Sequence, residues 1–234
     1  MMDKLSRFSS KLPADRLLAE FSLWSADLVR IADDIARVDQ HVDIYHADVA
    51  DGHFSPYMLL FPDLIAQIRP LTNKPIHVHL MVADGALADQ IDQFADAGAD
   101  LISIHAENAD VEAALDRISA RGLCAGLVLQ LHTSVASVRS HLGKLAILTL
   151  LGTQIGIKGV GLAPQAEDRL REARALIDES DGRTLLAADG GIRHHTVPGL
   201  RRAGADTIVM GSLAFGAEDL PGRMAWVHAQ PGPV

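Results

Sequence analysis

Short apolar runs of strand length alternate with longer amphipathic segments from about residue 20 to the end of the chain. This alternation predicts strands that are each followed by a helix, the pattern of a parallel sheet. The expected strands are 21–24, 42–47, 76–81, 101–105, 125–129, 145–151, 184–188 and 207–210. The expected helices include 27–38, 87–97, 111–120 and 165–177, with Pro164 suited to the first turn of the last one. Eight strands with helix-length segments between them predict a closed (β/α)8 barrel.

The length of 234 residues suits one barrel domain over 19–234, preceded by a short N-terminal helical extension over 1–18. An open doubly wound sheet is the alternative, but it usually carries a glycine-rich nucleotide fingerprint after the first strand. Here the first strand is followed by SAD, which favours the barrel. Two AGAD segments, at 97–100 and 203–206, each precede a strand and predict tight helix-to-strand connections.

Composition narrows the class of protein. Hydrophobic residues make up 48% of the chain, which is enough for a large core, and the net charge is −9. The chain has no broad basic field for nucleic acid or an anionic membrane, so we expect neither as a partner. Cys124 is the single cysteine, which excludes a disulfide framework. The first twenty residues contain no apolar signal segment, so we expect a cytoplasmic protein. A homo-oligomer is a possible assembly.

Polar side chains gather where barrel enzymes place their active sites, at the carboxyl ends of the strands. The second strand ends in His46 and Asp48, whose spacing of two residues points both side chains to one face. His77 and His79 share a face of the third strand, and Asp189 ends the seventh. The sequence therefore predicts that His46, Asp48, His79 and Asp189 face one mouth of the barrel.

A divalent metal explains this cluster. Burying two imidazoles and two carboxylates among apolar strands would cost several kcal/mol for each unpaired charge. Two nitrogen and two oxygen donors suit Zn²⁺, Fe²⁺, Mn²⁺ or Co²⁺ better than Ca²⁺ or Mg²⁺, and the residues leave the choice among those four open.

Six segments resemble the ribulose-phosphate 3-epimerase family, in order and at similar spacing over most of residues 20–216. They are SLWSAD (22–27), HADVADGHF (46–54), VHLM (78–81), AGADLISIHAE (97–107), ADGGI (188–192) and GADTIVMGSLAFG (204–216). The resemblance implies a (β/α)8 barrel that inverts C3 of a ketose phosphate, pentulose-phosphate-like, through an enediolate. It also implies that His46, Asp48, His79 and Asp189 bind the catalytic metal and that Asp48 and Asp189 are the acid/base pair. Ser22 matches a substrate-contacting position.

Inversion requires a proton to leave one face of the carbon and another to arrive at the opposite face. Because Asp48 and Asp189 come from different strands, they can flank the plane of the substrate. The phosphate of the substrate is expected near loops after strands six, seven and eight. The predicted residues there are Gly156, Lys158, Gly159, Gly190, Gly191, Gly211 and Ser212. Met81 and Phe215 are expected in the pocket wall, and His53 and His105 outside the core site.

The chain also differs from the family. GTQIGIKGV (152–160) stands where the family usually has SVNPGFGGQ, so that Lys158 replaces a glycine. Ala50 and Leu151 stand where the family usually has methionines, which predicts a different pocket shape.

Two other classes of function remain as alternatives. A Schiff-base aldolase needs a lysine at a strand end, and Lys158 lies beyond the end of strand six. Related decarboxylases use an Asp-x-Lys-x-x-Asp pattern, whereas Asp48-Val49-Ala50-Asp51 contains no lysine. A non-catalytic sugar-phosphate sensor would not require both bases and all four metal ligands.

Overall fold

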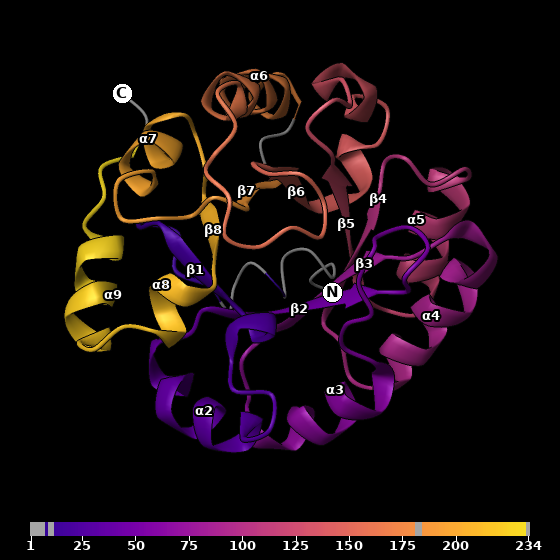
Figure 1. The fold of residues 1–234 in the computed structure, drawn as a ribbon. Coiled ribbons are helices and arrows are strands. Elements are labelled where there is room, and N and C mark those ends of the chain that lie inside the picture. Colours follow the sequence, from indigo (N-terminus) through magenta and orange to yellow (C-terminus); the bar gives the residue numbers. More distant parts are fainter. Residues whose placement is uncertain (1–7, 9–11, 181–183, 233–234) are drawn as a thin grey trace.

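In the computed structural model, which describes residues 8, 12–180 and 184–232, eight parallel strands close into a barrel in the order of the sequence (Figure 1). The strands are β1 (Leu18–Ser22), β2 (Ile44–Ala50), β3 (Ile76–Met81), β4 (Leu101–His105), β5 (Cys124–Leu129), β6 (Leu145–Leu151), β7 (Leu185–Asp189) and β8 (Thr207–Met210). Pairing of β1 with β8 closes the sheet, so that none of these described strands has an open edge. The prediction of a single (β/α)8 barrel is confirmed.

Helices surround the strands, as Figure 1 shows. They are α2 (Ile31–Val38), α3 (Pro62–Ile68), α4 (Asp84–Asp96), α5 (Val111–Ala120), α6 (Ala166–Glu179), α7 (Val197–Arg202), α8 (Ser212–Phe215) and α9 (Leu220–His228). Short 3-10 helices are η1 (Leu23–Ser25), η2 (Asp39–His41), η3 (Arg69–Leu71), η4 (Val135–Val138) and η5 (Leu142–Lys144). The buried faces recur every three or four residues, as in Leu87, Ile91 and Phe94 of α4, because one stripe of each helix packs on the sheet.

The predicted strands 76–81, 101–105, 145–151 and 207–210 have the observed bounds, whereas the first strand is misplaced. The predicted range is 21–24, but β1 begins at Leu18 and the chain turns into η1 at Leu23. Glu20 is the reason for the error, since a carboxylate interrupts the apolar run. In the structure Glu20 is buried inside the barrel.

Helix boundaries differ by a few residues. The helix expected over 27–38 begins only at Ile31, because the Asp27 side chain accepts a hydrogen bond from the Val29 backbone in a local turn. The helix expected over 165–177 begins at Ala166, so Pro164 precedes its cap and is not in its first turn. The extension predicted over 1–18 lies largely outside the described residues; of those described, Phe8 is helical and residues 12–17 are not.

The AGAD segments are turns that enter strands β4 and β8, as predicted. Gly98 and Gly204 adopt φ values of +97° and +109°, a region that L side chains rarely enter. Asp206 then accepts the Leu186 backbone N–H at 2.9 Å and the Arg174 guanidinium at 3.0 Å. The motif therefore ties a turn to the neighbouring strand.

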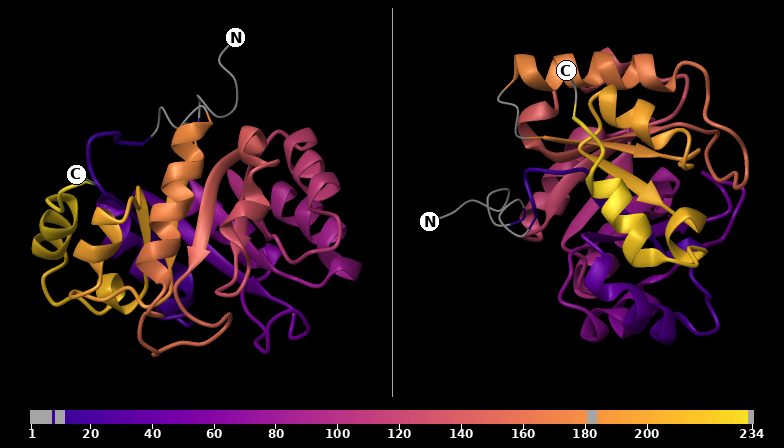
Figure 2. Two further views of the ribbon diagram at one scale, coloured as in Figure 1. Left: turned by 90° about the horizontal axis from the view of Figure 1, so that it is seen from above. Right: turned by 90° about the vertical axis from the view of Figure 1, so that its left-hand side faces the viewer.

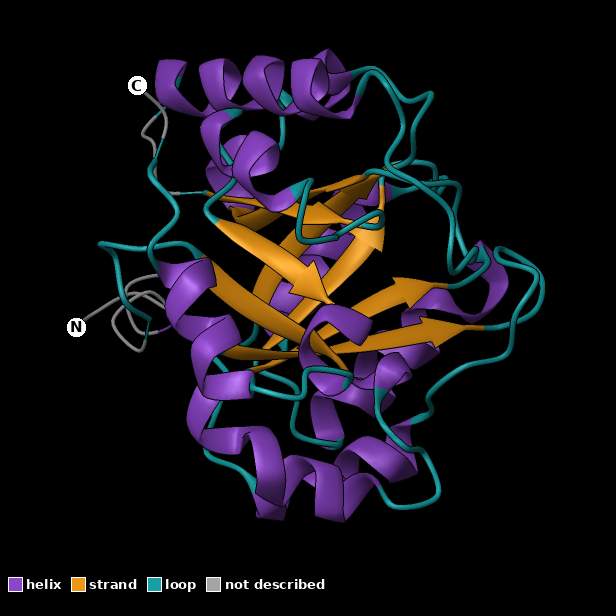
Figure 3. Cartoon of the chain, turned by 60° about the vertical axis from the view of Figure 1, so that its left-hand side comes forward, coloured by secondary structure: helices purple, strands orange, loops and turns teal. Residues whose placement is uncertain are grey.

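The interior of the barrel is layered. Its amino-terminal end is apolar and includes Ile44, Leu101, Cys124, Ile147 and Ala187, with Phe8 packed against them. Above this floor lies a polar layer of fully or almost fully buried side chains, which includes Glu20, His46, His77, Ser103, Thr149 and Thr207. The strands all point to one side of the molecule, where the long loops gather (Figure 3). The loop between β6 and α6 projects on that side in the left view of Figure 2.

Among the described residues, no helix combines the length and the apolar composition needed to cross a membrane.

Candidate active site

Four side chains predicted to meet do meet at the carboxyl ends of the strands. His46 and Asp48 come from β2, His79 from β3 and Asp189 from β7. One nitrogen or oxygen atom from each lies within 4.8 Å of the others. The register explains this, because Asp48 is paired with His79 and residues two apart on a strand share a face.

The two imidazoles each leave one buried ring nitrogen without a hydrogen-bond partner among the described residues. These atoms are His46 Nε2 and His79 Nδ1. His46 Nε2 lies 3.3 Å from Asp48 Oδ1, and His79 Nδ1 lies 3.5 Å from the same oxygen and 3.8 Å from Asp189 Oδ2. Buried polar atoms are nearly always satisfied, so two such nitrogens that face two carboxylates fit a divalent metal site.

The opposite nitrogen of His79 explains how its Nδ1 is kept free. His79 Nε2 lies 2.9 Å from His105 Nε2, and His105 Nδ1 lies 3.0 Å from Glu107 Oε2. An ionised carboxylate only accepts, so His105 donates from Nδ1 and accepts from His79 at Nε2. Burial lowers the pKa of His105 to about 4, which keeps it neutral. His79 therefore carries its proton on Nε2 and presents the Nδ1 lone pair to the site.

The two carboxyl groups of the site differ in their electrostatics. Burial raises the pKa of Asp189 to about 6, and the nearby charge of Asp48 acts in the same direction. Burial would also raise the pKa of Asp48, but His46 and His79 outweigh it and hold that pKa well below its usual range. Pairs of carboxyl groups with separated pKa values are typical of acid/base chemistry.

The site opens into a cavity of about 580 Å³ that contains every predicted substrate-binding residue in its lining. Those residues are Ser22, Gly156, Lys158, Gly159, Gly190, Gly191, Gly211 and Ser212. Ser22 also donates a hydrogen bond to Asp48 Oδ2 at 2.8 Å. Met81 and Leu151 belong to the wall, whereas Phe215 was expected there and packs instead edge-on against Phe21.

Several of the lining glycines are required by the backbone itself. A side chain at Gly190 would place its Cβ 2.4 Å from the Thr153 hydroxyl oxygen, and Gly190 and Gly191 both have positive φ. Gly156 also has positive φ, and a Cβ at this position would clash with the hydroxyl of Ser55. Turn geometry and close packing therefore account for these glycines, and their role toward phosphate stays a prediction.

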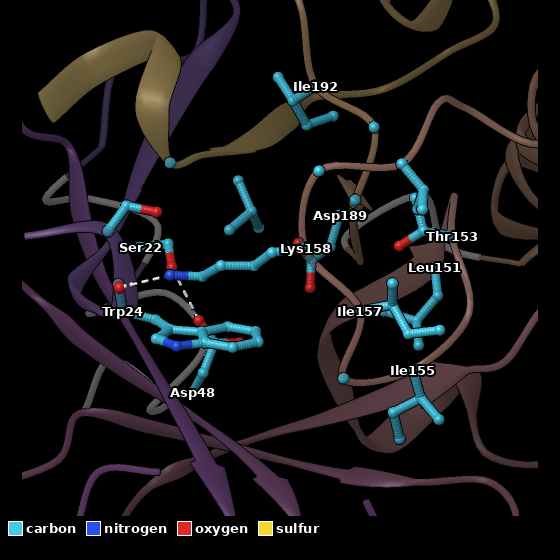
Figure 4. A pocket seen from close by; sticks show the side chains of 18 of the residues that line it. Ser22, Trp24, Asp48, Leu151, Thr153, Ile155, Ile157, Lys158, Asp189 and Ile192 are labelled. Carbon is cyan, nitrogen blue, oxygen red and sulfur yellow. Dashed lines mark hydrogen bonds between the residues drawn. The ribbon is translucent and has the colours of Figure 1, made fainter. Parts of the chain in front are cut away.

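Lys158 reaches across the cavity to Trp24 (Figure 4). Its Nζ donates to the Trp24 carbonyl at 2.6 Å and lies 4.1 Å from the centre of the indole ring. Partial burial lowers the pKa of Lys158, against the opposing charge of Asp48. Arg193 also lines the cavity, so its lining contains two basic side chains.

The prediction missed four residues behind the candidate metal ligands. His105 was placed outside the core site, but it contacts His79, whereas His53 is indeed exposed and bonds to the Asp51 backbone. Glu20, His77 and Glu107 were not assigned any role. His77 shares a face with His79, and this alternation was the signal that could have placed it in the interior.

Comparisons with known proteins point to the same family over most of the chain. Residues 18–215 match the sequence profile of the ribulose-phosphate 3 epimerase family. Ribulose-phosphate 3-epimerase 1 of Cupriavidus necator is 37% identical over 207 residues, which cover 86% of this chain and 85% of the relative. Ribulose-phosphate 3-epimerase of Escherichia coli is 35% identical over 203 residues, which cover 85% of this chain and 88% of the relative. The solved structure of KGPDC from Streptococcus mutans superposes with a TM-score of 0.68 at 15% identity, over 89% of this chain and 94% of that one, and this likeness shows the fold alone.

Proposed function

Because the chain belongs to the ribulose-phosphate 3-epimerase family, we propose that it inverts C3 of a ketose phosphate with Asp48 and Asp189 as its two acid/base groups. It is an isomerase of the epimerase class. The observation that supports the proposed mechanism is the convergence of four potential metal ligands from three strands, of which Asp48, His79 and Asp189 line one cavity.

Asp48 and Asp189 have distinct tasks in this mechanism. One carboxylate removes the C3 proton from its face of the substrate, and the other carboxyl group delivers a proton to the opposite face of the enediolate. They extend from β2 and β7, which are not neighbours in the barrel, and both carboxylates approach His79 Nδ1. Ser22 donates to Asp48 Oδ2, which restricts that carboxylate to one orientation.

His46, Asp48, His79 and Asp189 would hold the metal. A bound Zn²⁺, Fe²⁺, Mn²⁺ or Co²⁺ supplies a Lewis acid for the negative charge that develops on the substrate oxygens. The unpartnered nitrogens of His46 and His79 support this donor set. The residues do not favour one of these four metals over another.

The phosphate of the substrate is proposed to bind where the loops after β6, β7 and β8 meet. Gly156, Gly190 and Gly211 line the cavity, and Lys158 and Arg193 add two basic side chains to the same lining. Sugar phosphates are therefore the proposed partners. A cytoplasmic location, a homo-oligomer and the lack of nucleic-acid and membrane partners stay predictions from the sequence.

The proposed function is tested by incubating the metal-loaded protein in D₂O with a panel of ketose phosphates and free ketoses. Deuterium at C3, together with formation of the C3 epimer, is the expected result for a pentulose phosphate. A panel in which no compound exchanges its C3 proton would contradict the proposal and favour a sugar-phosphate sensor. Exchange only of unphosphorylated ketoses would contradict the phosphate assignment.

The lyase alternatives gain no support from the site. Among the described residues that line the cavity, Lys158 is the only lysine, and it lies in a loop with its Nζ bonded to a backbone carbonyl. A Schiff-base aldolase should form an adduct that borohydride traps in the presence of substrate. We expect no such adduct.

Lys158→Met is expected to raise KM by about 10- to 100-fold with little change in kcat, because a charged hydrogen bond to phosphate contributes about 1.5 to 3 kcal/mol. Steady-state kinetics with the substrate identified by deuterium exchange measures the effect. Lys74→Met is the matched control, since Lys74 precedes β3 at the opposite end of the barrel. An unchanged KM would show that Lys158 serves only its contact with Trp24.

A further inference from the structure

A carboxylate on β1, Glu20, is completely buried beneath the proposed metal site. Leu18, Glu20 and Ser22 alternate with the outward residues of this strand, so Glu20 points into the barrel one layer below Ser22. None of the hydrogen bonds that Glu20 makes with described residues involves lysine or arginine. Its partners are two imidazoles and one hydroxyl: His46 Nδ1 at 3.0 Å, His77 Nδ1 at 2.7 Å and Thr207 Oγ1 at 3.3 Å.

The chemistry of these partners fixes where the protons lie. Glu20 has no proton to donate as a carboxylate, so the Nδ1 atoms of His46 and His77 must both be N–H donors to its Oε2. The Ser103 hydroxyl, 2.7 Å from His77 Nε2, can donate to that nitrogen when His77 is a neutral imidazole. With Nδ1 protonated, neutral His46 has its lone pair on Nε2, the nitrogen that faces Asp48 and Asp189.

The side chains of this network are tightly packed against the backbone of β5 at Gly126. A Cβ at Gly126 on β5 would lie 2.0 Å from the Ser103 hydroxyl oxygen and 2.6 Å from an Ile147 methyl group. Glycine at this position therefore lets Ser103 reach His77. His77 in turn packs edge-on against His46, with ring centres 4.8 Å apart. The network is thus continuous from Ser103 on β4 to the ring of a proposed metal ligand.

We propose that Glu20 is a positioning residue for the metal: it holds His46 in the tautomer that presents Nε2, while His77 holds the same carboxylate oxygen in place. This inference rests on the proposed metal site and deepens it. The two imidazole ligands are then supported differently, because His46 donates directly to a buried carboxylate whereas His79 donates to the neutral ring of His105. Partners of this kind raise the basicity of a ligand and fix its ring, and their loss typically weakens metal binding by about 10- to 100-fold.

Glu20→Gln tests the proposal because it keeps the shape of the side chain and removes its charge. We expect the dissociation constant for Co²⁺, followed by the visible spectrum of the bound ion, to rise by about 10- to 100-fold. Thr207→Val is the matched control, since it removes a hydrogen bond to the same carboxylate but leaves both imidazole contacts. Its Co²⁺ affinity should stay within about threefold of wild type.

A second measurement does not depend on activity or on the stability of the variant. In wild-type protein loaded with Zn²⁺, nitrogen-15 NMR should find the His46 proton on Nδ1, in slow exchange with solvent, and Glu20→Gln should shift or broaden that signal. A proton on His46 Nε2 in the loaded wild type would overturn the proposal, as would a folded Glu20→Gln protein with wild-type Co²⁺ affinity. Failure of wild type itself to bind Co²⁺ or Zn²⁺ would instead refute the metal site. If Glu20→Gln does not fold, the position of the His46 proton in the loaded wild type decides the proposal by itself.

Discussion

His79→Ala is expected to lose most of its bound metal and most of its epimerase activity while it remains folded. The substitution removes one of the two imidazole donors, and the dissociation constant for the metal should rise by at least about 100-fold. The barrel should survive, because its apolar floor and outer packing lie away from this position. Elemental analysis after dialysis, circular dichroism and steady-state kinetics measure the three quantities.

His53→Ala is the matched control for this variant. His53 lies in the loop after β2, is exposed, and bonds through its ring only to the backbone of Asp51 among the described residues. Its metal content and turnover should equal those of wild type. Full metal occupancy and normal turnover in His79→Ala would remove His79 from the site and leave its unpartnered Nδ1 without an explanation.

The fold could be predicted from the sequence because parallel strands buried on both faces form continuous apolar runs. β6 and β8 are close to such runs, whereas β3 and β4 contain histidine or serine at alternate positions; the predicted ends of all four strands are the observed ones. β1 could not be placed in this way, since Glu20 interrupts the pattern and only the closed barrel gives this carboxylate its partners. The same error hid Glu20 from the candidate site.

The four proposed metal ligands could be predicted because their placement follows from two general rules of parallel sheets. Residues two apart on a strand share a face, and the carboxyl ends of parallel strands meet at one mouth. The partners of the ligands need more information, because the contact of His79 with His105 depends on the relative height of β3 and β4. The contact of Lys158 with Trp24 joins two loops, and no periodicity in the sequence encodes it.

Asp48→Asn and Asp189→Asn are each expected to lower net epimerisation by about 10²- to 10⁴-fold, the usual contribution of a positioned acid or base. Inversion needs a proton-transfer group on each face of C3, and either variant keeps one only. Both carboxylates are proposed metal ligands, so the metal content of each variant is measured first. Kinetics are then compared at saturating metal, where loss of the ion no longer contributes.

The metal-loaded variants should still exchange protons on one face. Each keeps a carboxylate, so it can remove the C3 proton of one epimer and return a deuteron from D₂O to the same face without inversion. Because Asp48 and Asp189 extend from β2 and β7, the two variants should label opposite epimers. Proton NMR of each pure epimer with each variant gives four exchange rates, of which two should be high and two low. If both variants label the same epimer, or if either interconverts the pair at nearly the wild-type rate, the two carboxylates do not act on opposite faces and a single-base mechanism must replace the one proposed.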